Sequence, residues 1–272
     1  MQQHAERIRM EGKTIGFVPT MGYLHEGHLS LIRIARKTSD VLVVSIYVNP
    51  TQFGPDEDLD QYPRDFKRDE AAAAEEGADI LFYPSNEEMY PDGYLTNVTV
   101  EEITQTLCGV SRPAHFQGVT TICTKLFHAV KPHFAVFGQK DYQQSVVIRR
   151  MVQDLNFDLK IVIGPIIREP DGLAMSSRNV YLSREERKEA LLLQKALSQL
   201  KKRIEQGERQ TEPLIREMTG LIQSGIHTRI DYIRIVHPDT LQDLEMIRER
   251  AVAALAVFVG KTRLIDNMIL VI

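Results

Sequence analysis

Two histidines, His25 and His28, form the most chemically suggestive pair in this sequence. They lie in the stretch PTMGYLHEGHLSL, where a short apolar run ends and a helical pattern begins. Three roles are open for the pair. The two rings could bind a metal ion, they could cap the helix as structural polar residues, or they could donate hydrogen bonds to a phosphate group.

The spacing of the pair argues against a metal ion. In the zincin pattern the two histidines lie four residues apart on a helix, so that both rings face one ion. Here they lie three apart with a glycine between them, and no third ligand is nearby. A helix start favours phosphate, because it offers unpaired backbone N–H groups and the positive end of the helix dipole. Phosphate binding is therefore the favoured interpretation, with helix capping as the alternative.

Other phosphate-binding and nucleophile motifs are incomplete or absent in this sequence. The letters GKT at 12–14 resemble the end of a Walker A loop, but the upstream glycine position is Arg7 and the letters precede a strand. No G-x-G-x-x-G pattern occurs, and no G-x-S-x-G pattern occurs. The sequence therefore predicts neither a dinucleotide cofactor nor a hydrolase of the serine type.

Alternating apolar runs and helical patterns indicate how these residues are positioned. Apolar runs at 14–19, 41–48, 78–84, 134–138 and 159–165 predict strands, and the patterns at 27–37, 64–77, 119–131 and 141–155 predict helices. Continuous apolar strands separated by helices are typical of a parallel sheet covered on both faces. Residues 1–170 are therefore predicted to form an α/β domain with a Rossmann-like, doubly wound parallel sheet.

The pattern changes after Pro170. A long charged helix is expected at 183–207 and a second helix at 212–224, followed by strands at 229–236, 251–260 and 262–272. These predict a smaller α+β domain over 171–272, expected to close over the site. The chain opens on a helical pattern without a preceding strand, which suggests that the natural product begins further upstream.

Composition limits the classes of partner. The chain has 272 residues and a net charge of −4, so nothing indicates attraction to nucleic acid or to an anionic membrane. The longest apolar run, at 251–259, is too short to cross a bilayer, and the N-terminus is too polar for a secretory signal. Two cysteines form neither a disulfide framework nor a zinc pattern. A cytoplasmic protein is expected.

Five further motifs give the histidine pair a context. The H-x-G-H stretch resembles that of the nucleotidyltransferase superfamily, which transfers adenylyl groups from ATP. The chain also contains, in this order, SIYVNPTQFG, YPRD, SRPAHFQGV, FGQKDYQQ and DGLAMSSRNVYLS. Together, over nearly the whole chain, these motifs resemble the pantothenate synthetase (pantoate–β-alanine ligase) family. The resemblance implies that pantoate is activated by ATP as an acyl adenylate, which the amine of β-alanine then attacks.

The resemblance also implies residue roles. Catalytic roles fall to His25, His28, Lys140 and Arg178, and the substrate-binding amides are those of Gln52 and Gln144. The implied ATP-binding residues are Met21, Gly22, Tyr23, Leu24, His25, Glu26, Gly27, His28, Gly138, Gln139, Lys140, Asp141, Ile167, Met175, Ser176, Ser177 and Arg178. Arg112 and His115 are weaker candidates in a loop expected to face the site.

The resemblance implies that the substrates are ATP with Mg²⁺, pantoate and β-alanine. It also implies that the chain forms a homodimer. Asp69 matches a position associated with the metal in the family, whereas the neighbouring acidic position is Arg68 here, which weakens that assignment. Two alternatives remain open. One is a nucleotidyltransferase that joins ATP to a mononucleotide, and the other is a nucleotide-sensing module without catalysis.

Overall fold

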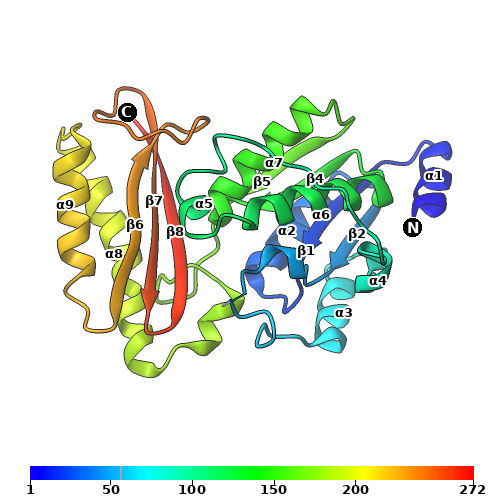
Figure 1. Ribbon diagram of the computed structural model, residues 1–272, viewed down its shortest axis with the longest axis horizontal. Helices are drawn as coiled ribbons and strands as arrows, with labels where there is room; N and C mark the ends of the chain where they lie inside the picture. Colours follow the sequence, from blue (N-terminus) through cyan, green and yellow to red (C-terminus); the bar gives the residue numbers. More distant parts are fainter. Residues whose placement is uncertain (56) are drawn as a thin grey trace. The chain divides into compact units, whose positions relative to one another are not determined.

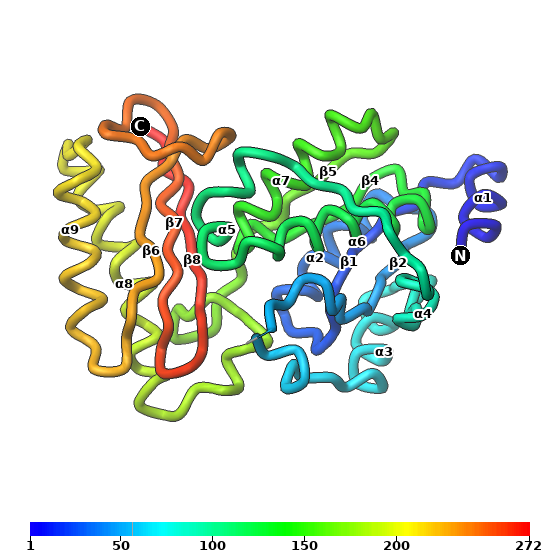
Figure 2. The backbone as a smooth tube through the Cα atoms, viewed as in Figure 1, coloured from blue at the N-terminus to red at the C-terminus, as the bar shows by residue number. Residues whose placement is uncertain are grey.

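The computed structural model describes residues 1–55 and 57–272, and these form two compact units. The N-terminal unit comprises residues 1–104, 112–139 and 144–166. The C-terminal unit comprises residues 105–111, 140–143 and 167–272. The chain therefore passes into the C-terminal unit twice, for two short segments, before it enters that unit for good (Figures 1 and 2).

The N-terminal unit contains a parallel sheet of order β3-β2-β1-β4-β5, which confirms the predicted Rossmann-like fold. Its strands are β1 (Ile15–Thr20), β2 (Val41–Ile46), β3 (Ile80–Phe82), β4 (Phe134–Gly138) and β5 (Lys160–Gly164). Its helical elements are α1 (Gln2–Met10), α2 (Glu26–Arg36), η1 (Pro50–Gln52), α3 (Phe66–Glu75), α4 (Asn86–Met89), α6 (His115–Val130) and most of α7 (Tyr142–Asp154).

Neighbouring residues of the central strand show that helices cover both faces of this sheet. Phe17 packs edge-on against Phe127 of α6, whereas Val18 belongs to a core cluster with Leu31 and Ile32 of α2. Successive side chains of a strand point to opposite faces. Helices α6 and α2 therefore lie on opposite faces, as a doubly wound sheet requires (Figure 1).

The C-terminal unit contains an antiparallel sheet of order β6-β7-β8, formed by Thr228–Val236, Arg250–Val259 and Thr262–Val271. Its helical elements are α5 (Cys108–Ser111), η3 (Ser177–Tyr181), α8 (Arg184–Glu205) and α9 (Thr211–Ile222), and it includes most of η2 (Gln139–Asp141). Leucines of α8 and α9 share one apolar core with alternate residues of β7. The predicted small α+β unit is therefore confirmed.

Several short elements had no signal in the sequence. Helices α4 and α5 and the 3₁₀ turns are only three to five residues long, too short for a hydrophobic period to appear. The strand expected at 78–84 is shorter, Ile80–Phe82, and lies at the edge of the sheet. Within the described residues, no helix has both the length and the apolar character needed to span a membrane.

Candidate active site

The predicted site residues of the N-terminal unit lie at the carboxyl edge of its parallel sheet. Strand β1 is followed in sequence by β2, but its other neighbour in the sheet is β4. The strand order therefore reverses between β1 and β4, which is the place where α/β sheets of this kind bind their ligands. The H-x-G-H stretch follows β1, Gly138 is the last residue of β4, and Gln139 comes directly after it.

The turn between β1 and the histidines has an unusual backbone. Gly22 and Tyr23 both lie in the left-handed region, with φ of 81° and 50°. At Gly22 a Cβ atom would lie 3.0 Å from both the Asp69 carboxylate and the Ile46 side chain, so any side chain here would force these neighbours to shift. Tyrosine rarely adopts this conformation, which costs about 1–2 kcal/mol. Contacts from elsewhere in the fold must therefore hold the turn.

Asp69 and Arg68 of α3 provide those contacts. The buried Asp69 carboxylate accepts hydrogen bonds from the N–H groups of Tyr23 (2.6 Å) and Leu24 (2.7 Å). Arg68 donates to the Leu24 carbonyl (2.7 Å), and its guanidinium lies 4.6 Å from the centre of the Tyr23 ring. Burial raises the pKa of the Asp69 carboxyl, although the two backbone donors act in the opposite direction. Arg68, which departs from the acidic residue implied by the family resemblance, therefore stabilises the turn through its guanidinium.

Asp69→Asn is expected to destabilise the protein by about 2 kcal/mol, because an amide nitrogen would face a backbone N–H that now donates to a carboxylate oxygen. The measurement is the urea midpoint of unfolding. Glu70→Gln is the matched control, since Glu70 is exposed on the same helix. Equal midpoints for the two variants would contradict the role given to Asp69.

The two histidines cap helix α2 with their own side chains. His25 is the N-cap residue, and its Nδ1 accepts a hydrogen bond from the Gly27 N–H (3.1 Å). The Nδ1 of His28 accepts one from the His25 N–H (3.3 Å), and the ring centres lie 4.1 Å apart. A backbone N–H can only donate, so each neutral ring carries its proton on Nε2. The capping alternative is therefore realised, and the same bonds make each Nε2–H a donor.

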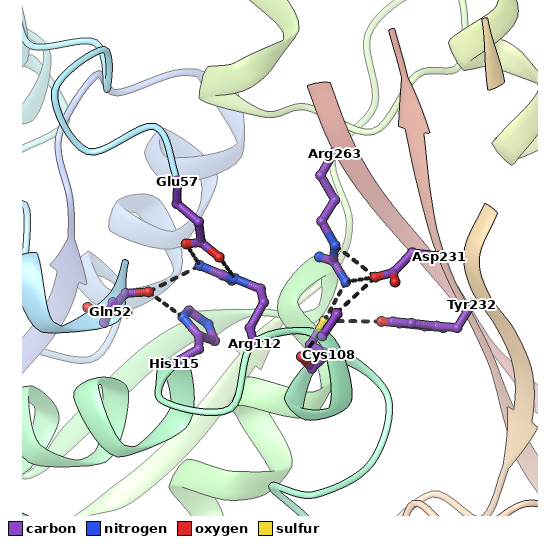
Figure 3. Close-up of polar contacts among 9 residues, drawn as sticks. Gln52, Glu57, Cys108, Arg112, His115, Asp231, Tyr232 and Arg263 are labelled. Atoms are coloured by element: carbon purple, nitrogen blue, oxygen red, sulfur yellow. Dashed lines mark hydrogen bonds and ion pairs between the residues drawn. The ribbon is translucent and has the colours of Figure 1, made fainter. Parts of the chain in front are cut away.

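The turn that carries Gln52 is held through its backbone. The Gln52 carbonyl accepts a hydrogen bond from Arg112 (3.1 Å), and His115 Nδ1 lies 2.9 Å from the same oxygen (Figure 3). Arg112 also pairs with both carboxylate oxygens of Glu57, at 2.6 Å each. The Gln52 side-chain amide, by contrast, makes no hydrogen bond to the described residues and belongs to a residue only 8% exposed. Arg112 and His115 thus act on Gln52, and the amide remains available for a ligand.

Two residues that the sequence did not single out complete this turn. Asn49 is fully buried, and its Nδ2 donates to the Gly118 carbonyl of α6 (3.1 Å). At Gly118 a Cβ atom would lie 2.3 Å from the Thr51 carbonyl oxygen and 2.8 Å from the Gln52 nitrogen. The backbone of α6 therefore approaches the Gln52 turn more closely than any side chain permits.

The ion pair between Glu57 and Arg112 is expected to make the stability of the protein depend on pH. Burial tends to raise the pKa of the Glu57 carboxyl, but its hydrogen bonds and ion pair with Arg112 outweigh burial, so that the pKa lies below the ordinary 4.5. A lowered pKa contributes stability that is fully present above 4.5 and is lost as the pH falls through the folded-state value. The difference in unfolding free energy between the wild type and Glu57→Gln should therefore shrink below pH 4.5. A difference that stays constant over that range would contradict this.

Gln144 lies half-buried near the start of α7, just after β4 and η2. No hydrogen bond joins its amide to the described residues, as for Gln52. Both glutamines belong to the N-terminal unit, and both follow strands whose carboxyl ends meet at one edge of the sheet. An amide can donate and accept at once, which suits a ligand that carries both hydroxyl and carboxylate groups.

The remaining predicted residues belong to the C-terminal unit. Lys140 and Asp141 lie in η2, and Ile167 begins a hairpin that leads to Met175, Ser176, Ser177 and Arg178. The Met175 N–H donates to the Ile167 carbonyl (3.0 Å), which closes the hairpin. Two contacts hold the Asp171–Gly172 turn at the tip of the hairpin. Asp171 pairs with Arg187 (2.7 Å), and the Gly172 N–H donates to the Glu169 carbonyl (2.8 Å). The hairpin and residues 175–178 are thus one folded element.

A metal site built by the protein needs several acidic, histidine or cysteine side chains around one point. Residues 1–55 and 57–272 contain no group of three or more histidine, cysteine, aspartate or glutamate side chains that could hold an ion. A cavity of ≈ 380 Å³ beside Met21 and Gly22 does carry acidic side chains. Of these, Asp65 and Glu88 accept backbone N–H bonds at helix starts, and Asp69 holds the Tyr23 turn. These three carboxylates therefore already accept hydrogen bonds from backbone N–H groups.

A histidine-capped helix start at the switch point of the sheet is the arrangement expected of an α/β nucleotide-binding enzyme. A family model described as pantoate-beta-alanine ligase matches residues 1–269. A pantothenate synthetase from Syntrophus aciditrophicus is 59% identical over 98% of this chain and 93% of that protein. The chain belongs to the pantoate–β-alanine ligase family.

Solved structures agree with this placement. The crystal structure of pantothenate synthetase from Thermus thermophilus matches with a TM-score of 0.92 and 47% identity, over 97% of this chain and 96% of that one. The pantoate-beta-alanine ligase of Francisella tularensis, complexed with beta-gamma ATP and beta-alanine, matches with a TM-score of 0.81 and 37% identity, over 98% and 94%.

Proposed function

We propose that this chain joins pantoate to β-alanine at the expense of ATP. A carboxylate oxygen of pantoate attacks the α-phosphorus of ATP, and the bond to the leaving pyrophosphate breaks. The amine of β-alanine then attacks the acyl carbon of pantoyl adenylate and loses a proton, and AMP leaves with that oxygen. The observation that carries the proposal is the pair of rings whose Nδ1 atoms cap α2, because this geometry makes both Nε2–H groups donors at a phosphate-binding helix start.

His25 and His28 stabilise charge in this proposal. Their Nδ1 atoms accept backbone N–H groups, so adding a proton there would break the cap. Each ring therefore acts as a neutral donor through Nε2, and its hydrogen bond strengthens as negative charge builds on the phosphate oxygens. The carboxylate nucleophile needs no base, which agrees with a site that relies on positioning and charge.

Lys140 and Arg178 supply positive charge to the polyphosphate in this proposal. A lysine ammonium acts as a mobile point charge, whereas a guanidinium can hold two oxygens at once. Ser176 and Ser177 add hydroxyl donors beside Arg178, and Asp141 is assigned to the ribose hydroxyls. Ile167 is assigned to the adenosine, beside the hydrogen bond that its carbonyl makes with the Met175 N–H.

Gln52 is assigned to pantoate and β-alanine, and Gln144 is assigned to pantoate. The support is that both amides lack a partner among the described residues, although the Gln52 turn is fixed by Arg112 and His115. A fixed backbone with an unpartnered amide suits a binding group, since little ordering of the Gln52 backbone is left for the ligand to impose.

Magnesium enters this proposal as part of the substrate. The acids near the site already accept backbone N–H groups, so we infer that Mg²⁺ arrives bound to the phosphates of ATP rather than in a protein cage. A homodimer and a cytoplasmic setting belong to the same proposal. Sedimentation equilibrium tests the dimer, and a monomer at micromolar concentration would contradict it.

Oxygen labelling tests the reaction. Pantoate labelled with ¹⁸O in its carboxylate is incubated with the chain, MgATP and β-alanine, and AMP is analysed by mass spectrometry. The proposal predicts that one labelled oxygen appears in AMP and that AMP and pantothenate form in equal amounts. AMP without label, or ADP as the nucleotide product, would contradict the adenylate.

A further inference from the structure

Strand β8 carries two consecutive polar residues that are almost fully buried. Asp266 and Asn267 are each 3% exposed, whereas most of the buried positions around them are apolar. Aspartate and asparagine are depleted in strands, and burying them is unfavourable unless their polar atoms are paired. The partners of these two side chains therefore indicate why the strand contains them.

Asn267 holds the backbone of Lys140. Its Nδ2 donates to the Lys140 carbonyl at 2.8 Å. Other bonds fix the same segment: the Tyr142 hydroxyl donates to the Pro238 carbonyl (3.0 Å), and the Gln143 amide donates to the Thr106 carbonyl (2.8 Å). Residues 140–143 are thus tied to the C-terminal unit at several points, which accounts for their membership of it.

Asp266 holds the hairpin that begins at Ile167. Its two carboxylate oxygens accept from Arg168 at 2.6 and 3.0 Å, and Arg168 also donates to the Gly172 carbonyl (3.2 Å). Asp266 Oδ1 further accepts the Asn267 N–H (2.8 Å), which couples the two neighbours. A bidentate pair of this kind is geometrically specific, so the hairpin has one orientation on β8.

A second polar group fixes the segment that Gln143 contacts. Arg263 of β8 pairs with Asp231 of β6 at 2.7 Å (Figure 3). The Ser111 hydroxyl also donates to Asp231 (3.0 Å). Cys108 lies 3.2 Å from the Tyr232 hydroxyl, and its N–H donates to the Gln143 amide oxygen (2.9 Å). Residues 105–111 therefore form a fixed base for the Lys140 turn within the C-terminal unit.

We propose that Asp266 and Asn267 are positioning residues that hold Lys140 and the 167–178 hairpin in one fixed arrangement for ATP. Asn267 acts on the lysine through its carbonyl, and Asp266 acts on the hairpin through Arg168. This inference rests on the proposed function, because it takes Lys140 and residues 175–178 as ATP ligands.

The test measures binding of a non-hydrolysable β,γ-methylene ATP analogue with magnesium by calorimetry. Asn267→Leu keeps the approximate shape and removes the donor, and it is expected to weaken binding about tenfold. Thr211→Val is the control, because Thr211 is also buried in the C-terminal unit and its hydroxyl also bonds a backbone carbonyl, that of Leu244. That control is expected to change the affinity by less than about twofold.

A double-mutant cycle separates positioning from general stability. If Asn267 acts through Lys140, Asn267→Leu should weaken binding by less than about threefold in a Lys140→Met background. The same factor in both backgrounds, or an effect no larger than that of Thr211→Val, would overturn the proposal. Asn267→Ser serves as a second variant if the leucine does not fold, since its hydroxyl is too short to reach the carbonyl.

Asp266→Asn tests the hairpin arm by hydrogen–deuterium exchange. Loss of the charge opposite Arg168 should speed exchange across residues 167–178 and leave residues 228–236 unchanged. If the substitution changed exchange by the same factor in both segments, or in neither, the role of Asp266 in holding the hairpin would be overturned. A wild type that binds the analogue but transfers no ¹⁸O would reject the proposed reaction alone, whereas a wild type that binds no analogue would reject both proposals.

Discussion

His28→Ala is expected to slow adenylate formation by about 10²–10³-fold, the loss typical when one donor to a developing oxyanion is removed. The same change should lower stability by only about 1 kcal/mol, because it removes one bond of the capping box. Two measurements check this. The pantoate-dependent release of pyrophosphate from ATP gives the rate, and urea unfolding gives the stability.

A second substitution at this position separates capping from chemistry. Glutamate is the usual third residue of a capping box, so His28→Glu should restore the bond to the His25 N–H and recover most of the lost stability. It supplies no donor and places a negative charge beside the phosphates, so its rate should be no higher than that of the alanine variant. Recovery of the rate along with the stability would show that His28 only caps the helix.

Gly118→Ala is expected to be the most destabilising single methyl addition at the site, by about 3 kcal/mol. The added Cβ would lie 2.3 Å from the Thr51 carbonyl oxygen, and backbone cannot rotate away as a flexible side chain can. Helix α6 or the Gln52 turn must therefore move. Because the Gln52 amide is assigned to pantoate, the KM for pantoate should rise about tenfold while that for ATP changes less.

Gly220→Ala is the matched control for this prediction. Gly220 also lies within a helix, α9, but nothing lies within 4 Å of the position that its Cβ would take. Alanine there should stabilise the protein by about 0.5–1 kcal/mol, as for an exposed helical glycine. If Gly118→Ala also stabilised the protein or left the KM for pantoate unchanged, the close approach of α6 would not matter for the site.

The architecture was predictable because its strands carry strong local signals. The runs that became β1, β2 and β4 are almost continuously apolar, as strands covered on both faces must be. The weakest prediction was β3, whose three residues lie at the sheet edge and are only half-buried. Short elements such as α5 depend on partners elsewhere in the chain, among them Asp231 and Tyr232, and a local pattern cannot reveal those.

The site was predictable only in part, for a similar reason. The histidines and the two glutamines stand in recognisable local motifs, but the residues that hold them act over long sequence distances. Asp69 reaches Tyr23 across 46 positions, and Asn267 reaches Lys140 across 127. Asp69 was a metal candidate because the family resemblance associates its position with the metal, whereas its carboxylate accepts hydrogen bonds from the backbone N–H groups of Tyr23 and Leu24. Contacts of this kind exist only once the chain has folded.

Isotope exchange between pyrophosphate and ATP tests the central claim most directly. The chain is incubated with MgATP, labelled pyrophosphate and pantoate, and β-alanine is left out. If pantoate forms an acyl adenylate reversibly, label enters ATP only when pantoate is present, and the exchange is slowed about 10²–10³-fold in His28→Ala. Exchange without pantoate, or its absence in a wild type that binds both ATP and pantoate, would contradict the account.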